Sequence, residues 1–198
     1  ALTPGFTGPA QPQGDKAMHD EAAGAWAAPF VMASINTKNV HRTNFLLGRP
    51  FGDDFIYDEM ALTGDGPKGK SRANAAAMGT VVTNALLGFA PTRALLRQFA
   101  LPKPGQGPTK EQRETGMFDV LMVGDTKDGR RLRAGVKGDK DPGYGCTSKM
   151  ISESAMCLAR DVGRDRTGGG VWTPGAAMGE TLIKRLEANA GMKFALEN

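Results

Sequence analysis

Four polar residues are spaced so that a helix would carry them on one face. They follow the spacing i, i+3, i+7 and i+10: Ser34, Thr37, His41 and Asn44. Hydroxyl, imidazole and amide groups on one face could line a polar cleft, where the histidine could transfer a proton. A solvent-facing strip, or polar groups satisfied inside the fold, is the simpler interpretation of the same pattern. His41 is therefore a candidate catalytic residue, and Thr37 and Asn44 are candidate substrate contacts.

A second candidate is the start of a helix predicted to reach about Asp161. Asp141 suits the N-cap of this helix and Pro142 suits its first position. Backbone N–H groups near Gly143 and Gly145 could bind a substrate carboxylate or a phosphate. Asp141, Gly143 and Gly145 are therefore candidate substrate contacts. Glycines beside a cap can equally serve tight packing alone.

Two side chains of the same segment could take part in catalysis. Tyr144 and Lys149 could polarise an oxygen or deliver a proton, which makes them candidate catalytic residues. A plain surface position is the alternative interpretation of Lys149. Two interpretations of the segment 141–149 remain open: it contacts a ligand, or it has only a structural role.

Residues that bind metals or form disulfides are few. Cys146 and Cys157 are the only cysteines, and eleven helical residues would separate them by about 16 Å of rise. A disulfide cannot span that distance. The adjacent pair Asp58-Glu59 would point to opposite faces of a strand, so it cannot act as a carboxylate pair. With only two histidines in addition, the sequence predicts reduced cysteines and no metal site.

One segment looks like the end of a glycine-rich nucleotide loop, namely Pro4-Gly5-Phe6-Thr7-Gly8. Such a loop needs a strand before it and a helix after it. Pro9 and Pro12 remove backbone donors where that helix would have to begin. The sequence therefore predicts no cofactor-binding residue in this chain.

Hydrophobic periodicity predicts the order helix, strand, two helices, hairpin, two helices and strand. The predicted bounds are a helix from Pro29 to about Leu47, a strand Phe55–Thr63, two helices within 68–100 broken at 88–91, a helical turn from Thr109, strands Met117–Val123 and Arg130–Val136, helices 141–161 and Gly175–Ala190, and a strand Met192–Leu196. This irregular order predicts an α+β fold with a mixed or antiparallel sheet of about four or more strands under helices, not a Rossmann fold.

The periodicity also predicts which residues are buried. The first helix is apolar around most of its circumference and should be mostly buried. The residues expected inside the later helices are Leu95, Leu96 and Phe99; then Ile151, Ala155, Leu158 and Val162; then Leu182, Ile183 and Leu186. The alanine-rich stretch 73–90 is too polar for a membrane span and is predicted to be a buried or interface helix.

The hairpin is predicted to turn at Asp128-Gly129, with Leu132, Ala134 and Val136 facing Leu121 and Val123. Three basic residues, Arg131, Arg133 and Lys137, then project from the other face. They could meet a polyanion, but no aromatic residue lies among them to stack on bases. A net charge of +4 is also too small to indicate nucleic acid. We predict a solvated sheet face and no nucleic-acid partner.

Four stretches, in order, resemble the C-terminal half of saccharopine dehydrogenase-like oxidoreductases, in particular the bacterial trans-acting enoyl reductase branch. The stretches are Ala28–Met32 with Ile35–Thr37 and Arg42–Asn44; Phe55–Glu59; Asp141–Gly145 with Lys149-Met150; and Gly169-Gly170 with Thr173–Gly179. They span most of residues 25–194. Members of this family begin with a Rossmann domain, which has no counterpart in this sequence.

The resemblance implies that residues 25–198 are the substrate-side or assembly domain of a reductase that uses NAD or NADP, after a linker or arm at residues 1–24. The nicotinamide would lie on residues outside this chain, and the fragment alone would be inactive. The partners implied are a small-molecule or acyl substrate and a second copy of the chain as a dimer. The expected compartment is cytoplasmic, with peripheral membrane attachment left open. A non-catalytic ligand-binding or dimerisation module is the alternative function.

Overall fold

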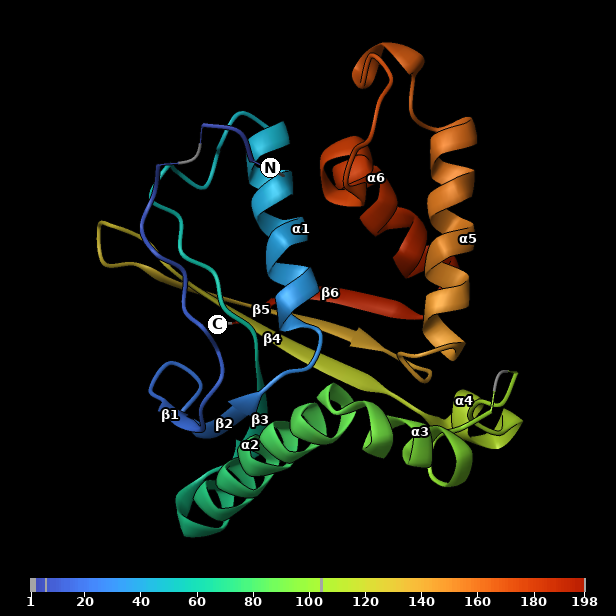
Figure 1. Cartoon of the computed structure of the whole chain (residues 1–198). Coiled ribbons are helices and arrows are strands. Elements are labelled where there is room, and N and C mark those ends of the chain that lie inside the picture. The colour runs from blue at the N-terminus through green and yellow to red at the C-terminus, as the bar shows by residue number, and fades with distance from the viewer. Residues whose placement is uncertain (1–2, 6, 104, 198) are drawn as a thin grey trace. The chain divides into compact units, whose positions relative to one another are not determined.

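The strands of this chain form two separate antiparallel sheets. In the computed structural model (Figure 1), which describes residues 3–5, 7–103 and 105–197, the sheet orders are β1-β2-β3 and β4-β5-β6. The chain divides into an N-terminal unit, residues 1–106, and a C-terminal unit, residues 107–198. The predicted α+β class is confirmed, and the described residues contain no Rossmann arrangement. The strands are shared between two three-stranded sheets instead of forming one larger sheet.

The N-terminal unit contains three helices and three strands among its described residues. They are β1 (Met18–Asp20), β2 (Ala25–Pro29), α1 (Ala33–Leu46), β3 (Met60–Gly64), α2 (Gly66–Gly88) and α3 (Ala90–Phe99). The break between α2 and α3 is at the predicted place. The short strands β1 and β2 were not predicted, and β1 lies inside the stretch 1–24 that was interpreted as a linker or arm.

The first turns of α2 lie directly on the sheet because two glycines permit it. A Cβ atom on Gly69 would lie 2.1 Å from the backbone oxygen of Gly64, at the end of β3. The Thr63 hydroxyl donates to the backbone oxygens of Trp26 and Gly69, each at 3.0 Å, and so joins β2, β3 and α2. Among the described residues of this unit, the buried apolar side chains are all alanines: Ala27, Ala28 and Ala73. Close backbone approach therefore replaces large side chains in this core.

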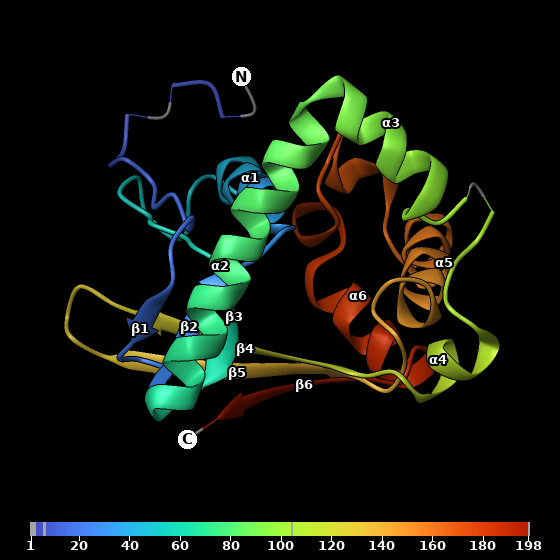
Figure 2. The ribbon, with the colours of Figure 1, turned by 60° about the horizontal axis from the view of Figure 1, so that its bottom comes forward.

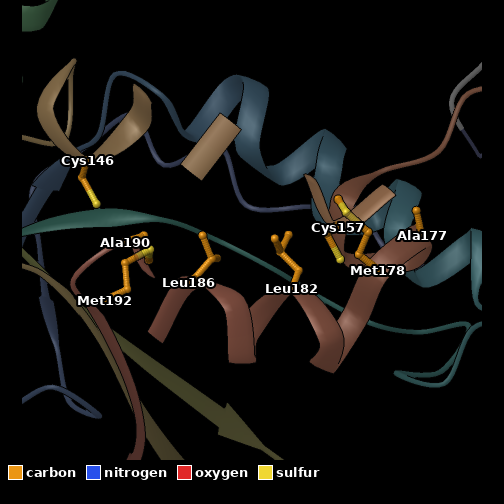
Figure 3. Packing of buried hydrophobic residues seen from close by; sticks show 8 residues of the cluster. All are labelled: Cys146, Cys157, Ala177, Met178, Leu182, Leu186, Ala190 and Met192. Atoms are coloured by element: carbon orange, nitrogen blue, oxygen red, sulfur yellow. The ribbon is translucent and has the colours of Figure 1, made fainter. Parts of the chain in front are cut away.

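The C-terminal unit carries the larger apolar core. Its elements are α4 (Lys110–Thr115), β4 (Phe118–Asp125), β5 (Arg131–Gly138), α5 (Gly145–Arg160), a short 3-10 helix (Arg164–Arg166), α6 (Pro174–Asn189) and β6 (Met192–Glu197). Figure 3 shows how side chains from α5, α6 and the start of β6 form the buried cluster. The helical turn predicted after Thr109 is present, and Thr109 closes a capping box with Gln112.

An ion-pair network joins α5 to α6. Arg185 of α6 lies 2.8 Å from a carboxylate oxygen of Glu153, within α5, and 2.8 Å from one of Asp161, the residue just after α5. Its guanidinium is planar and can bridge two carboxylates at once. The network fixes the rotation of α6 against α5 and complements the apolar cluster.

The hairpin is confirmed, but its predicted register is wrong by one residue. Thr126 N donates to Arg130 O, so three residues, Lys127 to Gly129, form the loop instead of two. Gly129 adopts a φ of 83° in this loop, which favours glycine. Leu132, Ala134 and Val136 consequently lie opposite Gly124, Met122 and Val120, not beside Leu121 and Val123. A one-residue shift moves every partner side chain to the other face.

Burial predictions are wrong, in whole or in part, for four helices. In α1 the only buried residue is the polar Asn44, whereas Val31 before the helix and Ile35 within it are exposed. In α5 the buried face is formed by Cys146 and Cys157 with Met150 packed against them; the predicted stripe members Ile151 and Leu158 are exposed, and of that stripe only Val162 packs against this cluster. In α3, Leu95 and Phe99 are exposed. In α6, Ile183 is exposed, while Leu182 and Leu186 are buried as predicted. The apolar periodicity identified apolar faces of the helices, but it could not show which face packs against another element.

The predicted strand Phe55–Thr63 is only partly a strand. Pairing with β2 covers Met60–Gly64, and residues 55–59 are extended without a strand partner.

Among the described residues, no single helix has the length and apolarity needed to cross a bilayer. Helices α2 and α3 satisfy that requirement only jointly, and a bend of 103° separates them.

The glycine contact under α2 gives a direct test of this packing. We expect Gly69→Ala to lower the free energy of unfolding of the N-terminal unit by about 2–3 kcal/mol, because the added methyl would meet the Gly64 carbonyl. Gly79→Ala, in the same helix with no atom near the added methyl, should raise it by about 0.5–1 kcal/mol. Urea unfolding followed by Trp26 fluorescence in a Trp172→Phe background measures both. Equal effects would contradict the packing.

Candidate functional site

In the polar stripe of α1, Ser34 is exposed, Thr37 and His41 are half-buried and Asn44 is buried. Two of these residues bind other parts of the chain. Asn44 is only 3% exposed; its amide donates to Gly52 O at 3.1 Å and accepts from Phe51 N at 3.0 Å. It therefore holds the turn that follows the helix. Thr37 donates its hydroxyl to Ala33 O, one turn earlier in α1, at 2.7 Å. The side chains of both residues hydrogen-bond to the backbone of this chain. This agrees with the interpretation of the stripe as polar groups satisfied inside the fold.

His41 belongs to a network built around Gln11, a residue that sequence reasoning did not single out. His41 Nε2 lies 3.0 Å from Gln11 Oε1, and the same oxygen accepts the Tyr57 N–H at 3.1 Å. The Gln11 amide nitrogen donates to Phe55 O and Pro9 O, each at 3.1 Å. The His41 ring also meets Phe55 edge-on at 5.4 Å between centroids. Gln11 thus ties the segment before β3 to α1.

A second cluster lies at the end of that segment. Glu59 accepts hydrogen bonds from the Tyr57 hydroxyl and from the Asn36 side-chain amide, both at 2.8 Å. Burial, followed by the hydrogen bond to Glu59, raises the pKa of Tyr57 well above its ordinary value. A phenol held protonated against a carboxylate is a poor proton donor to a substrate. This cluster is better suited to fixing residues 55–59 than to chemistry.

At the start of α5, Asp141 occupies the N–H groups that were predicted to bind substrate. Its carboxylate accepts from Tyr144 N at 2.7 Å and from Gly145 N at 3.1 Å, and these hydrogen bonds lower the pKa of Asp141. The helix begins at Gly145, so the predicted N-cap position of Asp141 and the helical position of Pro142 are wrong. The carboxylate still caps the helix, from three residues further back.

The two glycines of this segment differ in their roles. A Cβ on Gly145 would lie 2.5 Å from the backbone oxygen of Arg113, so this glycine is required where α5 passes the end of α4. A Cβ on Gly143 would make only ordinary contacts with the Asp141 carboxylate. Gly145 is thus a packing glycine, while Gly143 remains a candidate contact.

Tyr144 and Lys149 are the candidates with accessible functional groups. The Tyr144 side chain is 60% exposed, and its hydroxyl has no hydrogen-bond partner among residues 3–5, 7–103 and 105–197. Lys149 Nζ lies 3.9 Å from Asp139, a long ion pair that leaves the amine able to reach a ligand. Tyr144 is the N-cap residue just before α5, and Lys149 lies five positions further on, so their side chains are not neighbours on one helix face. Tyr144 is the better placed to donate a hydrogen bond.

An open pocket of about 500 Å³ lies at the start of α2, between Thr63 and Arg72. Its lining contains the spacing G-x-G-x-x-G at Gly64, Gly66 and Gly69, which the sequence analysis did not notice. Gly64 and Gly66 have φ values of 100° and 60°, and Gly69 allows the helix to touch the strand. The spacing is the one found in dinucleotide-binding loops.

The surroundings of this pocket do not fit a nicotinamide dinucleotide. Strand β3 pairs only antiparallel with β2 and lies at the edge of its sheet, whereas the dinucleotide fold needs a parallel neighbour. Pro67 removes one backbone donor from the first turn of α2, and Asp65 at the N-cap adds a negative charge. The rejected loop at residues 4–8 lies partly outside the described residues.

Two further groups show no reactive character. Arg131 pairs with Asp125 at 2.6 Å and Lys137 pairs with Asp119 at 2.8 Å across the β4–β5 hairpin, which neutralises much of the predicted basic stripe. Cys146 and Cys157 are free and buried, and burial raises the pKa of both thiols, which disfavours the reactive thiolate form. The described residues contain no cluster of metal-binding side chains.

Comparison with known proteins gives one clear result. The chain is 37% identical over 174 residues, 85% of its length, to the "Putative trans-acting enoyl reductase" of Mycobacterium tuberculosis. It is 35% identical over 170 residues to the "Trans-acting enoyl reductase" of Mycobacterium ulcerans, and 36% identical over 169 residues to that of Mycobacterium bovis. Each match covers 84% of this chain. The chain is therefore homologous to mycobacterial trans-acting enoyl reductases.

The matched region is only part of these relatives. The chain spans about two fifths of their length, 41% for the first and 40% for the other two. No family model matches the chain. No solved structure matches it.

The environment of His41 predicts a pH dependence of stability. Burial lowers the pKa of His41 below its ordinary value of about 6.5. The unfolded chain then binds more protons than the folded chain just below that pH, so the free energy of unfolding falls as the pH decreases through about 6.5. We expect His41→Gln to remove this part of the dependence in urea unfolding monitored by Trp26. An unchanged slope would show that His41 does not cause it.

Proposed function

We propose that this chain is the C-terminal, substrate-side part of an NAD(P)-dependent enoyl reductase of the saccharopine dehydrogenase-like group. The observation that carries the proposal is identity of 35–37% over 84–85% of the chain to proteins named trans-acting enoyl reductases. The matched region is 40–41% of the length of those proteins, so they contain further residues that could form a nucleotide-binding domain. The coenzyme would bind residues outside this chain and supply the hydride.

The contribution of this chain is to bind and orient the unsaturated acyl group. Reduction of a double bond conjugated to a carbonyl builds negative charge on the carbonyl oxygen, which a positioned hydrogen-bond donor stabilises. Among the predicted residues, Tyr144 alone combines an exposed ring with a hydroxyl that no described residue engages. Asp141 and Gly145 support it by fixing the backbone of the turn at the start of α5. Lys149 is a further contact along the same helix.

The other tyrosine provides a matched control. In the complete protein that contains this chain, we expect Tyr144→Phe to lower kcat for NAD(P)H-dependent reduction of an α,β-unsaturated thioester by about 100-fold or more. Tyr57→Phe removes a hydroxyl that Glu59 already holds and should leave kcat within about threefold. Rates are measured from NAD(P)H oxidation, with circular dichroism to compare folding. Equal rates for Tyr144→Phe and the unmodified protein would remove Tyr144 from the reaction.

The placement of the coenzyme is tested on the chain alone. We expect calorimetric titration of the 198-residue chain with NADH or NADPH to show no saturable binding, because the Gly64–Gly69 loop lacks the parallel strand and the full set of donors. Micromolar affinity would contradict the proposed division between this chain and a nucleotide domain. The alternative of a non-catalytic assembly module would be favoured if the complete protein bound no coenzyme and reduced no enoyl thioester.

A further inference from the structure

Helices α2 and α3 form an apolar arm, defined here as residues 74–101, that the rest of its unit does not cover. No residue from Asn74 to Ala100 is buried. In Figure 1 and Figure 2 the second half of α2 runs past the strands β1–β3 that its first turns contact. The exposed large apolar residues of the arm are Met78, Val81, Val82, Leu86, Phe89, Leu95, Phe99 and Leu101. An exposed apolar surface of this extent indicates a binding surface.

The apolar and cationic residues of α3 lie on different faces of that helix. In α3, Leu95 and Phe99 are four residues apart on one face and are 60% and 73% exposed. Arg93 and Arg97 share the opposite side of the same helix. In the second half of α2, Met78, Val82 and Leu86 follow the same spacing of four. Helices that lie in a membrane interface have this combination of an apolar face and a cationic face.

The charges in and beside the arm indicate which kind of surface it binds. The arm contains two arginines and no aspartate or glutamate, and the flanking residues 66–73 and 102–106 add four lysines and arginines and again no acidic residue, in a chain that has 21 acidic residues in total. Two other groups of exposed apolar residues lie near carboxylates in the chain: Ile151 and Leu158 share α5 with Glu153, and Leu196 adjoins Glu197. Lipid surfaces with anionic headgroups attract cations and repel carboxylates. Of these apolar surfaces, the arm alone matches such a surface in both apolarity and charge.

Three polar side chains of the arm donate to nearby backbone oxygens, whereas those of Thr83, Asn84 and Gln98 have no such partner among the described residues. Asn74 donates to Lys70 O and Thr80 donates to Ala76 O, each at 3.0 Å, one turn back in α2. Thr92 donates to the backbone oxygens of Leu86 and Phe89, and so occupies carbonyls at the break between the helices. A polar group that is hydrogen-bonded within its own helix costs less to move out of water. Asn74, Thr80 and Thr92 therefore keep these hydrogen bonds if the arm enters the hydrocarbon region of a bilayer.

We propose that the α2–α3 arm binds the surface of an anionic lipid bilayer, with Leu95 and Phe99 inserted among the acyl chains and Arg93 and Arg97 against headgroup phosphates. The arm lies on the membrane and does not cross it, because neither helix alone is a candidate span and the two meet at 103°. This proposal does not depend on the proposed reductase function.

Vesicle flotation tests the apolar face. We expect the 198-residue chain to float with vesicles of equimolar phosphatidylglycerol and phosphatidylcholine, and to float far less with phosphatidylcholine alone. Leu95→Asp combined with Phe99→Asp should weaken binding to the anionic vesicles at least about tenfold. The control is Val171→Asp, which places one such charge at a position that is 87% exposed and lies outside the arm. It should leave binding unchanged.

Charge reversal tests the cationic side. Arg93→Glu with Arg97→Glu should weaken binding to the same vesicles at least about tenfold, and added salt should reduce the binding of the unmodified chain. Lys184→Glu with Lys193→Glu makes the same change in net charge on exposed lysines of the C-terminal unit and should have little effect. Phe99→Trp in a chain with Trp26→Phe and Trp172→Phe gives a second readout, a blue shift of fluorescence on binding.

Three results would overturn the proposal. The first is no flotation with anionic vesicles together with no blue shift at position 99. The second is flotation that the arm variants and their controls reduce equally. The third is a lipid-independent dimer, seen by light scattering, that Leu95→Asp with Phe99→Asp dissociates while vesicle binding persists. That result would make the arm a protein interface.

Discussion

The contact between Gly69 and Gly64 is the constraint on which the N-terminal unit depends. With only alanines among its described buried apolar side chains, this unit cannot fix a helix by interlocking large side chains. It brings the α2 backbone against the end of β3 instead, and the Thr63 hydroxyl joins both to β2. This contact involves only the first turns of α2. The rest of the helix therefore extends beyond the sheet.

Features set by neighbouring residues could be predicted from the sequence, whereas features set by distant partners could not. The break between α2 and α3 and the capping box at Thr109 follow from Pro91, Thr109 and Gln112 within a few positions. The hairpin was also predicted, but its register depended on whether Gly129 was the second or the third loop residue. The buried face of α5 depended on α6, which supplies Arg185 and the apolar partners from another part of the chain.

The candidate site shows the same division. His41, Thr37 and Asn44 could be placed on one helical face, and all three are half-buried or buried. Gln11, which organises the environment of His41, carries no signal of its own, because its partners Phe55 and Tyr57 are more than 40 residues away. Asp141 was recognised as a capping residue, but the sequence could not show that its carboxylate would fill the very N–H groups proposed for a substrate. Polar residues that look available in a sequence are often satisfied by the fold itself.

The glycine spacing at the start of α2 shows why such a motif requires its structural context. In a dinucleotide fold the third glycine of G-x-G-x-x-G lets the helix approach the strand, while the first two shape the phosphate loop. Gly69 performs that same packing role here, and Gly64 and Gly66 have the positive φ values of a tight turn. The neighbouring strand is antiparallel, however, and Pro67 and Asp65 oppose an anion. The glycine spacing therefore indicates a close turn from strand to helix, which this fold and the dinucleotide fold both contain. Whether that turn can also bind a coenzyme depends on the surrounding sheet.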